Sequence, residues 1–190
     1  LYVKEIISMD EHNCIHAEIK RYGNIKDYFL GVPKDPKPRL EFIEKMIPAI
    51  IDNLNWFEDR IDSTGLLSNI EWWNFMDWVK DDKWSNGVPP NDKNGHSAIV
   101  NLLYAYSLDK ASEILEYYKY SSKSKQYIEL SKSIKTKVLS TCWDDKRKLV
   151  ADNSDSNSFS QHTLALAVLV DLVKADEQKS LLLNSYNNDS

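Results

Sequence analysis

The hydrophobic positions of this chain recur at helical spacing over most of its length. Apolar residues return every three or four positions, as on one face of an amphipathic helix, and no segment alternates apolar and polar residues as a strand does. We therefore expect an all-α fold of antiparallel helical hairpins. The expected helices cover residues 12–30, 40–61 (with a kink at Pro48), 95–118, 126–142 and 161–174, and a sixth begins near Asp176.

The segments between these helices alternate in length. Short links at 31–39, 119–125 and near 175 separate two long loops, 62–94 and 143–159. When antiparallel hairpins stand side by side, the links within hairpins lie at one end and those between hairpins at the other. We therefore expect both long loops on one face, where binding residues concentrate.

A weak internal repeat agrees with this arrangement. His96 and His162 lie 66 residues apart, and each opens a helix after a long loop. The Lys-Ala pairs that follow them, at Lys110 and Lys174, lie 64 residues apart. The positive end of a helix dipole disfavours a charged imidazole, so we expect neutral rings there. Chance similarity between two amphipathic helices is the alternative explanation.

The composition and net charge of the chain exclude several classes of protein. The chain has 190 residues, of which 42% are hydrophobic, so it can bury one core and forms one domain or part of a larger one. A net charge of -5 argues against nucleic acid and against an anionic membrane as partners. The longest apolar run, Leu164–Val170, is too short to span a bilayer.

We expect no cofactor and no metal. Cys14 and Cys142 have no Cys-x-x-Cys spacing, which excludes a disulfide framework and a structural zinc site. His12 and His16 lie four residues apart but lack a third ligand. The sequence contains no glycine-rich dinucleotide motif, phosphate loop or nucleophile elbow. The basic, serine-rich segment 119–125 is interpreted as a solvated turn.

The first long loop is unusually rich in indoles. It holds four of the six tryptophans, and Asp77 lies among them. Indoles offer flat apolar faces with a single donor, which suits stacking on a ring-shaped ligand such as a sugar. The alternative is that they close the end of a helical core.

Several motifs then occur in a characteristic order. They are Phe42-Ile-Glu-Lys-Met-Ile-Pro48-Ala, Leu54-Asn-Trp56-Phe57, Gly65-Leu-Leu, Trp73-x-Phe75-x-Asp77-Trp78, Tyr104-Ala-Tyr, Cys142-Trp143-Asp144 and Ser160-Gln161-His162. Together they resemble the catalytic domain of bacterial α-L-rhamnosidases of glycoside hydrolase family 78. The resemblance covers about residues 12–175 and implies an (α/α)6 toroid of twelve helices. Residues 1–190 would form about half of it, without an internal domain boundary.

The resemblance also implies roles for individual residues. Trp78 would stack on the sugar and Asp77 would accept hydrogen bonds from its hydroxyls, with Trp73 as a further contact. Gln161 and His162 would donate into the cavity. The structural alternative is that Asp77 and Trp78 buttress the loop, and that Gln161 and His162 make capping or packing contacts. Asp152 is interpreted as a turn residue, and Glu71 matches no role in the family.

The catalytic pair implied by the resemblance is missing from this sequence. In the family, the general acid lies in an upstream carboxylate- and arginine-rich segment, and the general base is a glutamate further downstream. We therefore assign no catalytic residue here, and expect a fragment of an enzyme that releases terminal α-L-rhamnose by inverting hydrolysis but is inactive alone.

The expected partners are rhamnose-containing glycosides or polysaccharides. An incomplete toroid also leaves apolar edges, through which we expect self-association. A periplasmic or secreted location is slightly favoured over a cytoplasmic one, and the two cysteines leave the compartment open. Two alternatives are a helical-repeat module that binds a peptide, and a carbohydrate-binding domain without catalysis.

Overall fold

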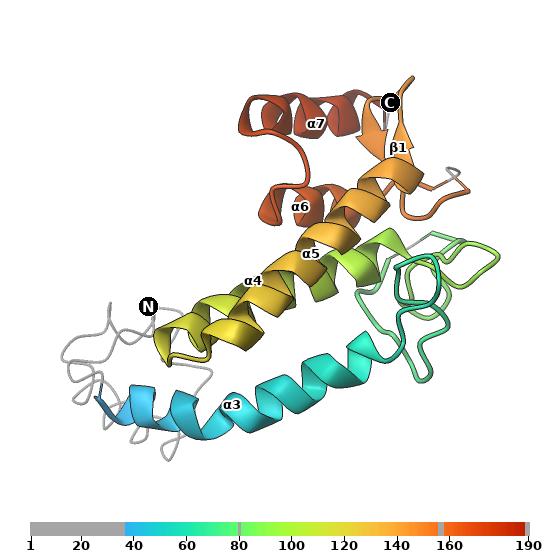
Figure 1. Cartoon of the computed structure of the whole chain (residues 1–190). Helices are drawn as coiled ribbons and strands as arrows, with labels where there is room; N and C mark the ends of the chain where they lie inside the picture. Colours follow the sequence, from blue (N-terminus) through green and yellow to red (C-terminus); the bar gives the residue numbers. More distant parts are fainter. Residues whose placement is uncertain (1–36, 80, 156–157, 189–190) are drawn as a thin grey trace, which may run out of the picture. The chain divides into compact units, whose positions relative to one another are not determined.

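The computed structural model describes residues 37–79, 81–155 and 158–188. Contacts divide the chain into two units, 1–49 and 50–190. The expected helix at 12–30, with His12, Cys14 and His16, lies outside the described residues. The elements in the described ranges are α3 (Lys37–Glu58), α4 (Ala98–Tyr117), α5 (Ser121–Cys142), β1 (Trp143–Asp144), β2 (Leu149–Val150), α6 (Gln161–Leu169) and α7 (Ala175–Asn188) (Figure 1).

Helix α3 crosses the boundary between the units. It continues through Pro48, whose missing amide removes one helical hydrogen bond. In the first unit, Ile47 is buried, whereas Phe42 and Met46 are exposed.

The core of the second unit lies between α4 and α5, which lie side by side (Figure 1). Two serine hydroxyls of α5 donate to carbonyls of α4: Ser124 to Ser112 and Ser131 to Ala105. The partner positions fall along α4 as they rise along α5, so the two helices are antiparallel. Small residues at these contacts allow the helices to approach closely. The largest fully buried side chains of this core include Ile99, Leu102, Leu108, Leu115, Tyr127, Ile134 and Val138.

The link between α4 and α5 is shorter than the sequence predicts. Lys119 adopts a left-handed φ of 67° and the amide of Tyr120 bonds the carbonyl of Leu115, which ends α4. Residues 121–125 then form the start of α5 instead of a solvated turn. Ser124 is buried, and the Lys123 amine donates to Asn55 at 3.0 Å.

The second long loop contains a β-hairpin that the sequence analysis missed. Trp143 pairs with Val150, and Asp144 pairs with Leu149. The Asp144 carboxylate accepts the amides of Lys146 and Arg147, which shapes the turn. Two-residue strands are too short to show alternation, so the hydrophobic pattern did not reveal them.

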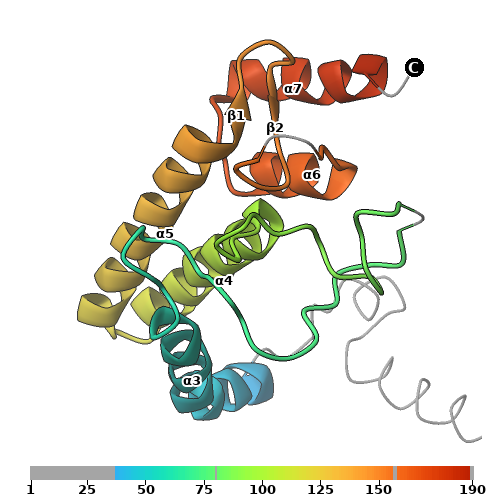
Figure 2. The same cartoon turned by 90° about the vertical axis from the view of Figure 1, so that its right-hand side faces the viewer.

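Both long loops lie at one end of the α4–α5 hairpin, as predicted. This is the right-hand end of the hairpin in Figure 1, the side that faces the viewer in Figure 2. The first amide of α4, that of Ala98, donates to the carbonyl of Asp152 at 2.7 Å. The Ser154 hydroxyl donates to Asp92 at 2.6 Å. The second bond joins the two loops directly, and the first joins the second loop to the start of α4.

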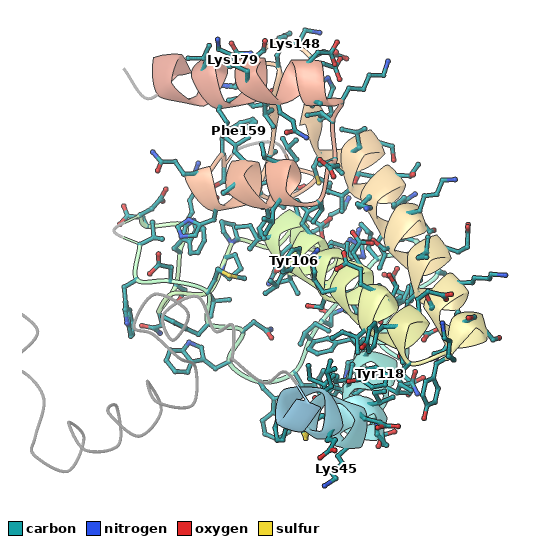
Figure 3. The ribbon with its side chains drawn as sticks, turned by 90° about the vertical axis from the view of Figure 1, so that its left-hand side faces the viewer. Lys45, Tyr106, Tyr118, Lys148, Phe159 and Lys179 are labelled. Carbon is teal, nitrogen blue, oxygen red and sulfur yellow. The ribbon has the colours of Figure 1, made fainter. Side chains whose placement is uncertain are left out.

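Helices α6 and α7 are the last two elements of the described part of the chain. Ser160 caps α6 by accepting the amide of Thr163, and Asp171, with φ 51°, ends the helix earlier than expected. Figure 3 shows Phe159 between α6 and α7, and the Arg147 guanidinium lies 4.9 Å from the centre of its ring. No helix within the described ranges combines the length and apolar character needed to cross a membrane.

Candidate functional site

Three aromatic side chains of the first long loop form an exposed cluster. We call Trp73, Phe75 and Trp78 the aromatic patch, and the loop that carries them, residues 59–97, the Trp loop. Ring centroids lie 5.1 Å apart for Trp73–Phe75 and for Phe75–Trp78, and 6.2 Å apart for Trp73–Trp78. The three residues are 61%, 40% and 71% exposed, respectively. Exposed aromatic surface of this kind is typical of a binding site, because water solvates it poorly.

The turn around Gly87 holds the aromatic patch in place. The Gly87 carbonyl accepts the amide of Met76 at 2.8 Å, and the Trp73 indole donates to the carbonyl of Asn86 at 3.0 Å. Gly87 has φ 77°, and a Cβ there would meet the Phe75 ring at 2.5 Å and the Asp77 carbonyl at 2.9 Å. Only glycine fits this contact, since a side chain would both strain the backbone and displace Phe75.

We expect Gly87→Ala to destabilise the fold and to shift the aromatic patch. The left-handed backbone alone costs about 1–2 kcal/mol for a non-glycine residue, and the clash with Phe75 adds to that cost. Gly65→Ala is the matched control, because Gly65 has φ 85° but nothing within 4 Å of a Cβ. Urea unfolding should show a larger loss for Gly87→Ala. Equal losses for the two variants would mean that Phe75 does not press on Gly87.

Asp77, beside the aromatic patch, is paired with His162 of α6. His162 Nε2 lies 2.9 Å from Asp77 Oδ2, and the amide of Trp78 donates to Asp77 Oδ1 at 2.7 Å. The bond from His162, followed by that from Trp78, lowers the pKa of Asp77 below its ordinary value. Asp77 is exposed, and its ionised carboxylate can accept hydrogen bonds from a ligand.

The ring of His162 packs against an indole. Trp84, which is buried, lies with its ring centroid 5.1 Å from that of His162. Packing of this kind limits the orientations that the imidazole can adopt. Trp84 and Phe75 were not predicted as site residues, because their place among the loop's aromatic residues is the only signal in the sequence.

Asp152 fixes the start of α6 and so the position of His162. It is fully buried, and its Oδ1 accepts the amide and hydroxyl of Ser160 and the hydroxyl of Thr163. Its Oδ2 accepts the hydroxyl of Ser158 at 2.6 Å. The interpretation of Asp152 as a turn residue was therefore incomplete, because this carboxylate organises the N-terminus of α6.

The structure thus joins four of the five predicted site residues through two contacts. One is the ring contact of Trp73 with Trp78, and the other is the hydrogen bond of Asp77 with His162. Gln161 is the exposed first residue of α6 and is next to His162 in the chain. Within the described ranges, no three His, Cys, Asp or Glu side chains gather as metal ligands would.

Comparisons with known proteins identify the fold. Residues 39–187 match the family model for the bacterial alpha-L-rhamnosidase 6 hairpin glycosidase domain. A rhamnosidase of glycoside hydrolase family 78 from Bacillus sp. GL1 is 20% identical, with a TM-score of 0.62 over 75% of this chain and 15% of that one. A rhamnosidase from Klebsiella oxytoca, solved with rhamnose bound, is 17% identical, with a TM-score of 0.59 over 76% of this chain and 26% of that one. No curated protein matches the chain.

These findings confirm the expected fold class, an all-α arrangement of helical hairpins that forms part of an (α/α)6 toroid. The chain spans only 15% and 26% of the two solved structures, and at such low identity the likeness shows the fold alone. The family model covers most of the chain. The chain therefore belongs to the family of bacterial α-L-rhamnosidase six-hairpin glycosidase domains.

Proposed function

We propose that this chain is part of a glycoside hydrolase that releases terminal α-L-rhamnose from glycosides by inverting hydrolysis, and that it supplies residues that bind the sugar. The observation that carries the proposal is the exposed aromatic patch beside the Asp77–His162 pair. The Klebsiella oxytoca relative, whose structure holds rhamnose, supports a carbohydrate ligand.

The chemistry of the site suits a deoxysugar. Rhamnose has a methyl group and C–H faces that can lie against indoles, while its hydroxyl groups need acceptors and donors. In this proposal Trp78 and Trp73 contact the apolar parts of the sugar. Asp77 accepts its hydroxyl hydrogens, and His162 and Gln161 complete the polar contacts.

The proposal also implies that this chain does not hydrolyse rhamnosides on its own. Inverting hydrolysis needs a general acid and a general base about 6.5–9.5 Å apart. The segments that carry this pair in the family do not occur in this sequence. Asp77, already paired with His162, would bind the sugar instead of activating water.

A binding experiment tests this proposal. We expect calorimetric titration of the purified chain with L-rhamnose to give weak binding, which Trp78→Ala reduces roughly fivefold by removing about 1 kcal/mol of stacking. Tyr117→Ala is the control, because Tyr117 is an exposed aromatic residue at the other end of α4. Absence of binding, or equal losses in both variants, would contradict the assigned site. Turnover of an aryl α-L-rhamnoside by this chain would contradict its proposed inactivity.

We also propose that the chain self-associates through apolar surface on α6 and α7. Leu169, Leu182 and Leu183 are 55%, 46% and 53% exposed. In a complete toroid each hairpin buries such residues against its neighbour. Light scattering over a range of concentrations should therefore show mass that rises with concentration, and Leu182→Lys with Leu183→Lys should suppress the rise. A constant monomer mass would contradict this proposal.

A further inference from the structure

His96 connects the start and the end of the Trp loop. It is largely buried and lies two residues before α4. Its Nε2 lies 2.8 Å from Asp62 Oδ2, at the start of the loop. Its Nδ1 lies 3.1 Å from Asp92 Oδ2, near the end of the loop. Each ring nitrogen therefore faces a carboxylate oxygen, which can only accept a hydrogen bond.

This geometry favours a proton on both nitrogens of His96, because the one other contact printed for a ring nitrogen, Thr64 Oγ1 to Nε2, is longer at 3.4 Å. A neutral imidazole has one N–H group, so it would direct a lone pair at one of the two carboxylates. An imidazolium donates to both. The sequence alone favoured a neutral ring at this helix start, but two adjacent full negative charges outweigh the partial positive charge of a helix N-terminus.

The cluster also reaches the second long loop. Asp92 Oδ2 accepts the hydroxyl of Ser154, and Asp92 Oδ1 accepts the amides of Asn94 and His96. At the other side, Asp62 accepts the amide and the hydroxyl of Thr64. The carboxylates are thus held in place by other donors, so they present a preformed site to the imidazolium.

We propose that His96 is a positioning residue which, as an imidazolium between Asp62 and Asp92, closes the Trp loop and fixes it against the second long loop. We call these three residues the His96 clasp. The aromatic patch and Asp77 lie between the two ends of the loop, so the clasp holds them in a single arrangement for binding a sugar. Only this consequence rests on the proposed function, because the clasp itself is a feature of the loop.

The electrostatics of the cluster support the clasp. Burial opposes the charged carboxylates, but bonds from Thr64 and His96 lower the pKa of Asp62 to about 2, and bonds from Ser154 and His96 lower that of Asp92 to about 2. Burial also opposes the charge on His96, whereas Asp62 and Asp92 raise its pKa above the ordinary 6.5.

A further titratable group interacts with Asp92: the thiol of Cys142, at the end of α5. Asp152, in the second long loop, interacts electrostatically with the same thiol. Burial raises the pKa of the Cys142 thiol, so this group stays neutral over the pH range in which the clasp operates. The Asp152 carboxylate is engaged by hydroxyl groups of the α6 N-terminus.

The direction of the pH dependence follows from these shifts. A raised pKa on His96 stabilises the fold below pH 6.5, and this stabilisation is lost as the pH rises through the raised value. The lowered pKa values of Asp62 and Asp92 stabilise the fold above pH 3.8, and this contribution is lost as the pH falls towards 2. The clasp is therefore complete between pH 3.8 and pH 6.5. It opens on the alkaline side as His96 loses its proton, and on the acid side as Asp62 and Asp92 gain theirs.

Nitrogen NMR of the histidine rings in the full chain tests the protonation directly. We expect both His96 nitrogens to carry protons at pH 6 and to titrate with a midpoint above 6.5. Asp62→Asn keeps an acceptor oxygen but removes the charge, so it should lower this midpoint. Asp82→Asn is the matched control, because Asp82 is an exposed carboxylate on the same loop, and it should leave the midpoint unchanged. A neutral tautomer of His96 at pH 6, or an unchanged midpoint in Asp62→Asn, would overturn the clasp.

Hydrogen exchange tests the positioning role. We expect the protection factors of Trp-loop amides, which correct for the intrinsic pH dependence of exchange, to fall on the order of tenfold in His96→Gln at pH 6, and in the unmodified chain at a pH above the midpoint. If His96→Gln does not fold, the unmodified chain and Asp62→Asn still carry the test. Loop exchange that is independent of the His96 charge would overturn the role.

Sugar binding separates this inference from the proposed function. The affinity for L-rhamnose should fall above the His96 midpoint, in parallel with loop opening. Absence of L-rhamnose binding at every pH, with the loop still responding, would reject the proposed ligand and leave the clasp standing. Constant affinity while the loop opens would reject the role of His96 in positioning the site.

Discussion

Asp152→Ala should lower the free energy of unfolding by about 3–5 kcal/mol, which is the largest stability effect we expect from one substitution in this chain. The carboxylate is fully buried and is the acceptor for the hydroxyls of Ser158, Ser160 and Thr163. Removing it leaves these donors without their partner in a region closed to water. The start of α6 should fray as a result, and His162 should lose its fixed position.

The comparison with two other variants makes this prediction specific. Asp152→Asn keeps the oxygen that accepts from Ser160 and Thr163, and its amide can donate to Ser158, so a smaller loss is expected. Asp155→Ala removes an exposed carboxylate from the same loop and should change stability by less than about 0.5 kcal/mol. Thermal unfolding should show a fall of about 10 °C for the alanine variant of Asp152. Similar melting temperatures for Asp152→Ala and Asp155→Ala would show that the buried network contributes little.

The helices could be predicted from the sequence, but their ends could not all be placed. The three- and four-residue period located α4 and α5, because burial of one helix face imposes it. The start of α5 was missed because residues 121–125 have the composition of a turn, and packing of Ser124 against α4 outweighs that local signal. The β-hairpin was missed because its strands are two residues long.

The site could be predicted as a set of residues but not as a geometry. The order of motifs pointed to Asp77 and His162, yet nothing in the sequence shows that these residues, 85 positions apart, share a hydrogen bond. That contact depends on two loops that meet at one end of the α4–α5 hairpin. The alternating loop lengths predicted that the two loops lie together. Which side chains form hydrogen bonds between the Trp loop and α6 is seen only in the folded chain.

Asp152 and His96 show why buried polar groups are the hardest to interpret. An aspartate among serines and asparagines looks like a turn residue, and a histidine before a helix looks neutral. The role of each residue depends on its hydrogen-bond partners, which lie elsewhere in the chain. These partners are Ser158 and Thr163 for Asp152, and Asp62 for His96. A pattern of local spacing carries no information about such partners.

In the intact enzyme that would contain this domain, Asp77→Asn should reduce kcat/KM more than Trp78→Ala does. The carboxylate would accept sugar hydroxyls and favour the positive charge that develops on the ring in the transition state. We expect a loss on the order of tenfold to a hundredfold in kcat/KM for Asp77→Asn. Trp78→Ala should raise KM roughly fivefold with little change in kcat, because an indole stacks equally on the ground state and on the transition state.

The alternative role, a structural buttress for the loop, predicts a different result. Asp77 accepts the amide of Trp78 and contacts His162, and Trp78 packs on Phe75 and Trp73, so both residues could act by holding the loop together. In that case the variants would lower the melting temperature and leave the kinetics of each folded molecule unchanged. Measuring melting temperature and kcat/KM on both variants, with Asp82→Asn and Tyr117→Ala as controls, separates the two roles. Kinetics equal to those of the unmodified enzyme, at any melting temperature, would remove Asp77 and Trp78 from the sugar site.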